Sequence, residues 1–329
     1  MSSIKISELK KLPYIANIPT GKQAFYSYPY FDEDKKQYLW QLPNENLEFI
    51  YLFAEPVECF YYSKSKTDIE KDLDINFFEV LICNYSYAFT KTSIDYIAHD
   101  ILNLSAVFEK YFIFLNYTSL SPENYKQILI RTEIEYFFGV IRSLYDLLQI
   151  LIKHFVKHYL KMELPNSFGA MLNENTCEIK SKYSNLPKQL NVYYKSNAKL
   201  FFRCKDIRNE IYHNGITNHF IFHYEEGFGI DYNSFNFSEF GVWPQDKIKE
   251  NNIVSLLALF AYVTKAIILN MNDLALALLE AFKPHNPLIS NDYMILLRGT
   301  CTEHLNKLDK YLDEQWFLQR RAAAYPKSQ

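Results

Sequence analysis

The chain has 329 residues, and its 35 Lys and Arg against 38 Asp and Glu give a formal net charge of −3, which by itself disfavours a nucleic-acid partner. Its 8 glycines form neither G-x-x-x-x-G-K-[ST] nor G-x-G-x-x-G, which excludes a P-loop ATPase and a Rossmann dehydrogenase at the motif level. The 5 cysteines include no C-x-x-C pair, so we expect a reducing compartment and no structural zinc site.

No segment of the sequence is typical of export or membrane insertion. Charges are scattered through the first residues, which lack the uninterrupted apolar run of a signal peptide. The apolar stretch 136–152 contains Arg142, Asp146 and Gln149, which argues against a membrane span. We therefore expect a cytoplasmic protein without a membrane partner.

Residues 1–87 are the least helical part of the chain. Short aromatic or β-branched runs at 48–53, 57–62 and 77–83 are typical of strands, and Pro and charge clusters separate them. We predict a small mixed α/β region here.

The chain then becomes helical. Apolar residues recur at spacings of three or four over 94–115, which predicts a helix. Ser121-Pro122-Glu123 is typical of a helix start, and no proline follows before Pro165, so the next helix is either continuous or hinged near Gly139. Later helices are predicted over 187–213, 253–282 and 292–315, and residues 219–224 and 229–232 predict a short β-hairpin.

The predicted fold class is therefore mainly α. Residues 88–283 are expected to form an up-and-down bundle of four or five helices that carries the hairpin as an insertion. The mixed region 1–87 precedes the bundle, and a C-terminal helix and tail, 284–329, follow it.

One segment at the end of a predicted helix stands out for its chemistry. Arg208 is followed directly by Asn209 and five residues later by His213, and only 7 of the 35 basic residues are arginines. On a helix Asn209 and His213 share a face, and the helix end favours a protonated imidazole. If the last turn tightens before Gly215, Arg208 and His213 can converge on one anion. Arg208 would then hold the oxygens of a phosphodiester transition state while His213 moves the proton.

This R-N-x-x-x-H segment, at the end of a late helix in a cysteine-poor α protein, resembles the HEPN superfamily (higher eukaryote and prokaryote nucleotide-binding domains). The resemblance implies an α-bundle that dimerises so that two copies of the motif form one cleft. It also implies metal-independent endoribonuclease activity, with RNA as substrate and no cofactor, in toxin–antitoxin or anti-phage defence systems that include an antitoxin or defence partner. The position two residues after His213, often Tyr in one subgroup, is Gly215 here.

Local charge supports a site for a phosphate backbone. Residues 151–215 contain eleven basic and five acidic side chains, a charge of +6, and the rest of the chain carries −9. Within this window Lys153, Lys157 and Lys161 recur every four residues, and Lys205 precedes the motif by one turn. We expect these four lysines to bind substrate.

Several alternatives stay open. The protein could be a non-catalytic HEPN-like module that binds RNA or protein, or a purely structural helical protein. Arg142 and Asp146 can form an intrahelical ion pair or line the cleft. His154 and His158 have the spacing of a metal pair but lack the intervening glutamate of a zinc-protease helix, so no metal site is expected. Arg298 and His304 repeat the motif with one extra residue in a loop-like setting, and we interpret them as a decoy.

Overall fold

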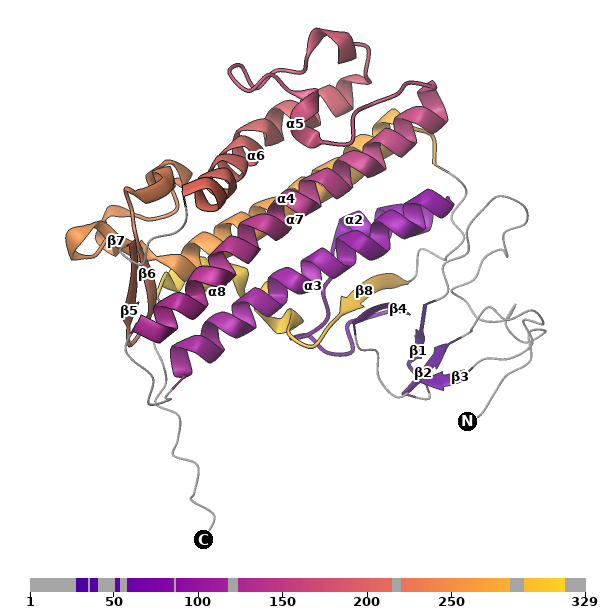
Figure 1. The fold of residues 1–329 in the computed structure, drawn as a ribbon. Helices are drawn as coiled ribbons and strands as arrows, with labels where there is room; N and C mark the ends of the chain where they lie inside the picture. The colour runs from indigo at the N-terminus through magenta and orange to yellow at the C-terminus, as the bar shows by residue number, and fades with distance from the viewer. Residues whose placement is uncertain are drawn as a thin grey trace.

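The computed structural model describes residues 28–34, 36–40, 51–53, 58–85, 87–117, 124–214, 220–284 and 293–316. This part of the chain is mainly helical and carries small sheets, in agreement with the predicted class (Figure 1). The start signal at 121–123 and the glycine after His213 lie outside the described residues.

Four long helices form the body of the molecule, and consecutive ones run antiparallel. The start of α3 meets the end of α4, where the hydroxyls of Tyr87 and Tyr159 lie 2.9 Å apart. The start of α6 likewise faces the end of α4, because Tyr194 donates a 2.6 Å hydrogen bond to Gln149. No hinge interrupts α4 at Gly139. The four helices are α3 (Ala88–Asn116), α4 (Asn124–Leu160), α6 (Lys188–Asn214) and α7 (Leu256–Ala281).

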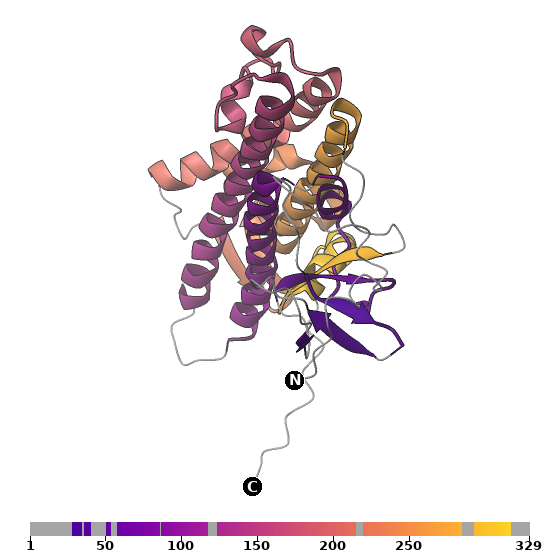
Figure 2. The same cartoon turned by 90° about the vertical axis from the view of Figure 1, so that its right-hand side faces the viewer.

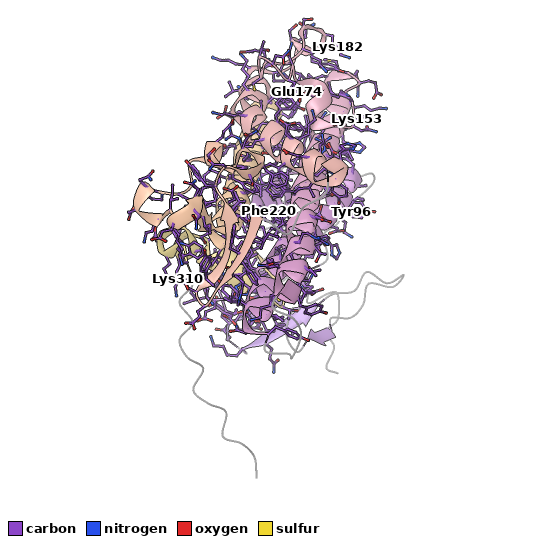
Figure 3. All side chains as sticks on the ribbon, turned by 60° about the vertical axis from the view of Figure 1, so that its left-hand side comes forward. Tyr96, Lys153, Glu174, Lys182, Phe220 and Lys310 are labelled. Atoms are coloured by element: carbon purple, nitrogen blue, oxygen red, sulfur yellow. The ribbon has the colours of Figure 1, made fainter. Side chains whose placement is uncertain are left out.

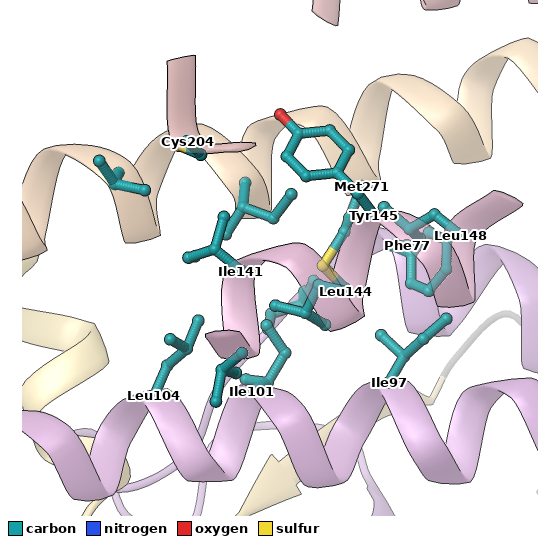
Figure 4. Close-up of a cluster of buried hydrophobic side chains, with 14 of the residues drawn as sticks. Phe77, Ile97, Ile101, Leu104, Ile141, Leu144, Tyr145, Leu148, Cys204 and Met271 are labelled. Carbon is teal, nitrogen blue, oxygen red and sulfur yellow. The ribbon is translucent and has the colours of Figure 1, made fainter. Parts of the chain in front are cut away.

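The core lies between these helices, with α4 in its centre (Figure 4). Apolar side chains spaced three and four residues apart on each helix turn to the same side, and they are fully buried. Each such side chain stabilises the fold by roughly 1.5–3 kcal/mol. The cluster includes Ile97, Ile101 and Leu104 of α3, Ile141, Leu144 and Leu148 of α4, and Met271 of α7.

A five-stranded sheet lies on the α3 side of the molecule, away from α6 (Figures 1 and 2). Its strand order is β3-β2-β1-β4-β8, and only the β1–β4 pairing is parallel. A strand from the C-terminal region therefore completes the sheet of the N-terminal region. The strands are β1 (Tyr30–Asp32), β2 (Gln37–Trp40), β3 (Tyr51–Phe53), β4 (Cys59–Ser63) and β8 (Met294–Arg298).

Two short apolar runs adopt the opposite structure to the predicted one. Residues 77–83, predicted as a strand, lie in helix α2 (Asn76–Asn84), which packs on α7. The predicted helix 292–315 is wrong in its first part, which forms β8 before the short helices η6 (Thr302–Lys307) and α8 (Leu308–Glu314). Both runs are almost entirely buried, and a short buried run shows neither period clearly in its sequence.

The predicted hairpin is confirmed, and it belongs to a second, antiparallel sheet. Strand β5 (Ile221–Tyr224) pairs with β6 (Gly227–Asp231), which also pairs with β7 (Ile253–Ser255). β7 leads directly into α7, whose first turn is capped by the Ser255 hydroxyl accepting from the Ala258 backbone. The remaining short elements are α5 (Phe168–Met171), η1 (Ser181–Tyr183), η3 (Ser234–Phe240), η4 (Gln245–Lys247) and η5 (Glu250–Asn252).

One described helix, α7, is long and apolar enough to cross a membrane by those criteria alone. It packs against α2, α4, α6 and α8 in this fold, and the core helix of a globular protein meets the same criteria.

Candidate functional site

The R-N-x-x-x-H residues lie on the last two turns of α6, at the boundary between core and surface. Ile207 and Ile211, four residues apart, are buried and fix the rotation of the helix. Arg208 and Asn209 are therefore half-buried beside them, while His213 is exposed. The local apolar pattern thus places the motif where a ligand can reach it.

Arg208 is held by its own helix. Its guanidinium carbon lies 4.4 Å from the ring centroid of Tyr212, one turn further on, and one terminal nitrogen donates to Asn209 Oδ1 at 3.3 Å. Its Nε is inaccessible to solvent and has no hydrogen-bond partner among the described residues. Unpaired charged donors of this kind are costly, and they favour an anionic ligand.

A second arginine, Arg142 of α4, lies close enough to Arg208 for their charges to repel each other. Burial and the positive charge of Arg208 lower the pKa of Arg142, although Asp146 acts in the opposite direction. Arg142 Nε pairs with Asp146 Oδ2 at 3.3 Å, and its Nη2 donates to Ser167 Oγ at 2.8 Å. Its Nη1 is buried without a partner in the described structure. The intrahelical ion pair is therefore present, and it sits beside the motif.

Arg142 also lines a pocket of about 310 Å³ between α4, α5 and α6. The pocket carries two lysines, Lys180 and Lys205, and one acid, Glu174, which pairs with Lys205 at 2.8 Å. With Arg142 the lining has three cations and one anion. The pocket lining therefore carries a net positive charge, as phosphate binding requires, although Arg208 is not among its lining residues.

The last turn of α6 does not tighten. The segment stays α-helical through Asn214, so His213 lies about 140° round the helix from Arg208 and about 7.5 Å along it. The His213 imidazole forms no hydrogen bond or ion pair with any described residue, and the contact of Asn209 is with Arg208. Within one chain, Arg208 and His213 therefore point in different directions.

The four predicted substrate lysines fall into two groups. Lys205 lines the pocket beside Arg142. Lys153, Lys157 and Lys161 lie near the other end of α4, and Lys157 is about 22 Å along the helix axis from Arg142. Their amines already have partners: Asn166 Oδ1 at 2.8 Å, Glu163 at 2.6 Å and the His158 carbonyl at 2.8 Å, respectively.

The predicted lysine stripe is therefore not continuous with the motif. α4 ends at Leu160, so Lys161 lies beyond the helix in a left-handed conformation (φ 57°). Figure 3 shows Lys153 in the upper part of the molecule and Phe220, the first described residue after α6, near its middle.

Two pairs were disfavoured as sites, His154 with His158 and Arg298 with His304. In the structure their members make contacts within the fold. His154 stacks on Phe89, with ring centroids 5.3 Å apart, and His158 lies 4.6 Å from the Tyr87 ring. Arg298 is 4% exposed and donates a hydrogen bond to Asp72 at 2.7 Å. None of these contacts involves Arg208 or Arg142.

Sequence reasoning missed two residues at the site. Tyr212 has the i, i+4 relation to Arg208 that allows ring and guanidinium to stack, so spacing alone could have indicated it. Lys180 carried no local signal, because its position on the pocket depends on how the 161–187 connection folds back on α6.

The fold and site define a mainly helical protein with a cationic cluster at one helix end. Comparisons with protein families, with curated proteins and with solved structures find no match to this chain. The function of this protein is therefore inferred from the residues of the chain itself.

Proposed function

We propose that this protein is a metal-independent endoribonuclease of the HEPN type that uses Arg208 and His213. The observation that supports it best is a pair of guanidiniums, those of Arg208 and Arg142, whose charges repel each other and each of which has a buried N–H that lacks a partner in the described structure. Two such positive groups favour the binding of an anion such as a phosphodiester. The toxin or anti-phage setting is proposed from the resemblance alone.

The proposed reaction needs a base, an acid and a cation. A neutral His213 would take the proton from a ribose 2′-OH, whose oxygen attacks the adjacent phosphorus. The bond from phosphorus to the 5′-oxygen then breaks as a water molecule supplies a proton to that leaving oxygen. The products are a 2′,3′-cyclic phosphate and a 5′-OH end. Arg208 would stabilise the charge on the non-bridging oxygens in the transition state.

The orientation of the motif supports an active site shared by two copies. Because Arg208 and His213 diverge by about 140° on one helix, one chain does not present both to the same phosphate. A two-fold axis near the end of α6 would place Arg208 of one copy beside His213 of the other. Tyr212 is 56% exposed and Tyr136 of α4 is 41% exposed, which gives this end aromatic surface of the kind that interfaces bury.

The first test is cleavage of single-stranded RNA in EDTA. We expect a 2′,3′-cyclic phosphate product from the wild type and a rate at least about 100-fold lower for Arg208→Ala and His213→Ala. Lys199→Ala, an exposed residue on the same helix, is the control and should cleave normally. Cleavage that survives both motif substitutions would overturn the proposal.

The second test asks whether the site is shared. Arg208→Ala and His213→Ala proteins are mixed, so that mixed dimers contain one intact Arg208 and one intact His213 on opposite copies. Recovery of activity on mixing is expected if the pair acts between chains. Two results would contradict the shared site. One is activity in either variant alone, and the other is a mixture that is as inactive as each variant while the wild type is active.

The divergence of Arg208 and His213 also favours a second candidate, a non-catalytic module that binds RNA. It predicts binding that weakens steeply with salt, through Arg142, Lys205 and Arg208, without any cyclic phosphate product. Product analysis separates the two functions.

A further inference from the structure

A second set of ligating side chains lies where η6 packs on α3. It consists of Glu109 of α3 with Glu303 and His304 of η6, and one ligand atom of each lies within 4.8 Å of the other two. The residues are almost two hundred positions apart in the chain, so no sequence spacing indicates the set. It lies on the face of α3 that meets η6, whereas Arg208 lies on α6.

The imidazole of this set is held in a fixed position. His304 is 8% exposed, its Nδ1 lies 2.8 Å from the Tyr311 hydroxyl, and its Nε2 lies 2.8 Å from Glu109 Oε2. Phe112 stacks on the ring at 5.2 Å. A histidine whose second nitrogen is bonded to a fixed oxygen is the usual arrangement of a metal ligand, because that bond orients the ring.

Among the described residues, no lysine or arginine pairs with either carboxylate of the set. Glu303 Oε2 is inaccessible to solvent and has no hydrogen-bond partner in the described part of the chain. The neighbouring lysine, Lys110, bonds instead to Glu133 at 3.2 Å. A buried carboxylate oxygen without a partner, beside a second carboxylate, is costly unless a cation binds between them.

We propose that Glu109, Glu303 and His304 bind a divalent transition-metal ion of the Zn²⁺ or Mn²⁺ class. One imidazole nitrogen with two carboxylate oxygens suits these ions better than Ca²⁺ or Mg²⁺, which take oxygen ligands. The side chain of Glu109 is 41% exposed, which gives an ion access from solvent. The bound ion would clamp η6, and with it β8 and α8, onto α3. It has no part in the RNA cleavage proposed above.

The test measures metal content and cobalt spectra of the full chain. Protein stripped with EDTA is dialysed against Zn²⁺ or Mn²⁺, and bound metal is determined by mass spectrometry; Co²⁺ provides a visible absorption band from its ligand field. We expect about one ion per chain, a higher Tm with metal, and at least about 10-fold weaker binding for Glu303→Gln, which keeps the shape of the side chain. Glu314→Gln, an acid of α8 outside the set, is the control.

A further variant separates binding from folding. Tyr311→Phe removes only the hydroxyl that faces His304 Nδ1, and we expect its circular dichroism to match the wild type while its affinity for Co²⁺ falls by about 10-fold. A wild-type chain that retains no ion after dialysis, or a Glu303→Gln chain that binds as tightly as the wild type, would overturn the proposal.

Discussion

Two arginines of this chain are each followed by a histidine, and their surroundings are opposite. Arg298 is 4% exposed, pairs with Asp72, and donates to the hydroxyls of Tyr38, Tyr61 and Thr67. Arg208 is half-exposed, rests on Tyr212, and keeps a buried Nε without a partner in the described residues. The first arrangement satisfies a buried charge within the fold, and the second leaves capacity for a ligand. A similar spacing draws attention to both arginines, and in the structure the count of their partners separates them.

The largest expected contrast is in stability. Arg298→Ala removes one partner of a buried ion pair and leaves Asp72, which is fully buried, without its cation. Such changes cost about 3–5 kcal/mol of unfolding free energy. Urea denaturation followed by circular dichroism measures the loss.

Arg208→Ala is the matched change at the other arginine. Because Arg208 is half-buried and has no acidic partner among the described residues, we expect Arg208→Ala to change the unfolding free energy of the protein by less than about 1 kcal/mol. Equal losses at the two positions would refute the distinction between a structural and a ligand-binding arginine.

The second contrast concerns how the unfolding free energy depends on pH. Burial alone would raise the pKa of Asp72, but hydrogen bonds from Arg298 and Tyr61 outweigh it and leave that pKa lowered. The resulting stabilisation is therefore complete above the unfolded value of about 3.9 and is lost as the pH falls through the lower folded value.

We expect the unfolding free energy of the wild type to fall as the pH drops below about 4, and that of Asp72→Asn to fall less steeply, because this variant has no carboxyl group to protonate at position 72. Denaturation midpoints between pH 7 and pH 3 measure the two slopes. Asp74→Asn, at an exposed neighbouring position, should retain the wild-type slope. Parallel curves for the wild type and Asp72→Asn would contradict the role of the pair.

How much of the fold the sequence could predict depends on which side chains of each element are buried. The long helices followed from apolar residues spaced three and four apart, as in 94–115, since one buried face leaves a period in the sequence. The runs 77–83 and 294–298 were assigned wrongly, because elements that are almost entirely buried have too few polar positions to reveal that period. The motif itself was visible, but for Arg142 the sequence left open whether it pairs with Asp146 or lines the cleft, since its position relative to Arg208 depends on how two helices pack.

A smaller contrast is the effect on the unfolding free energy of replacing a glycine near each arginine, Gly299 after Arg298 and Gly139 beside the Arg208 motif. A Cβ at Gly299 would lie 2.5 Å from Leu102 Cδ2 and 3.2 Å from Thr302 Cγ2. The tip of Leu102 can move, but Thr302 is buried and its hydroxyl donates to the Lys71 carbonyl at 2.6 Å. We therefore expect Gly299→Ala to cost about 1–2 kcal/mol, measured by urea denaturation. A neutral effect would show that this corner is loosely packed.

Gly139 gives the smallest effect and the opposite sign. It lies inside α4 beside the motif, and a Cβ there would meet only the Tyr212 hydroxyl oxygen, at an ordinary 3.8 Å. Gly139→Ala should therefore gain about 0.5–1 kcal/mol from helix propensity and leave RNA cleavage unchanged. Gly139→Leu reaches further and would displace the Tyr212 ring from beneath Arg208. We expect the unfolding free energy of Gly139→Leu to stay within about 1 kcal/mol of the wild-type value. If Tyr212 positions Arg208, the rate of RNA cleavage by this variant should fall by up to about 100-fold. Retained cleavage would mean that Arg208 acts without the support of Tyr212.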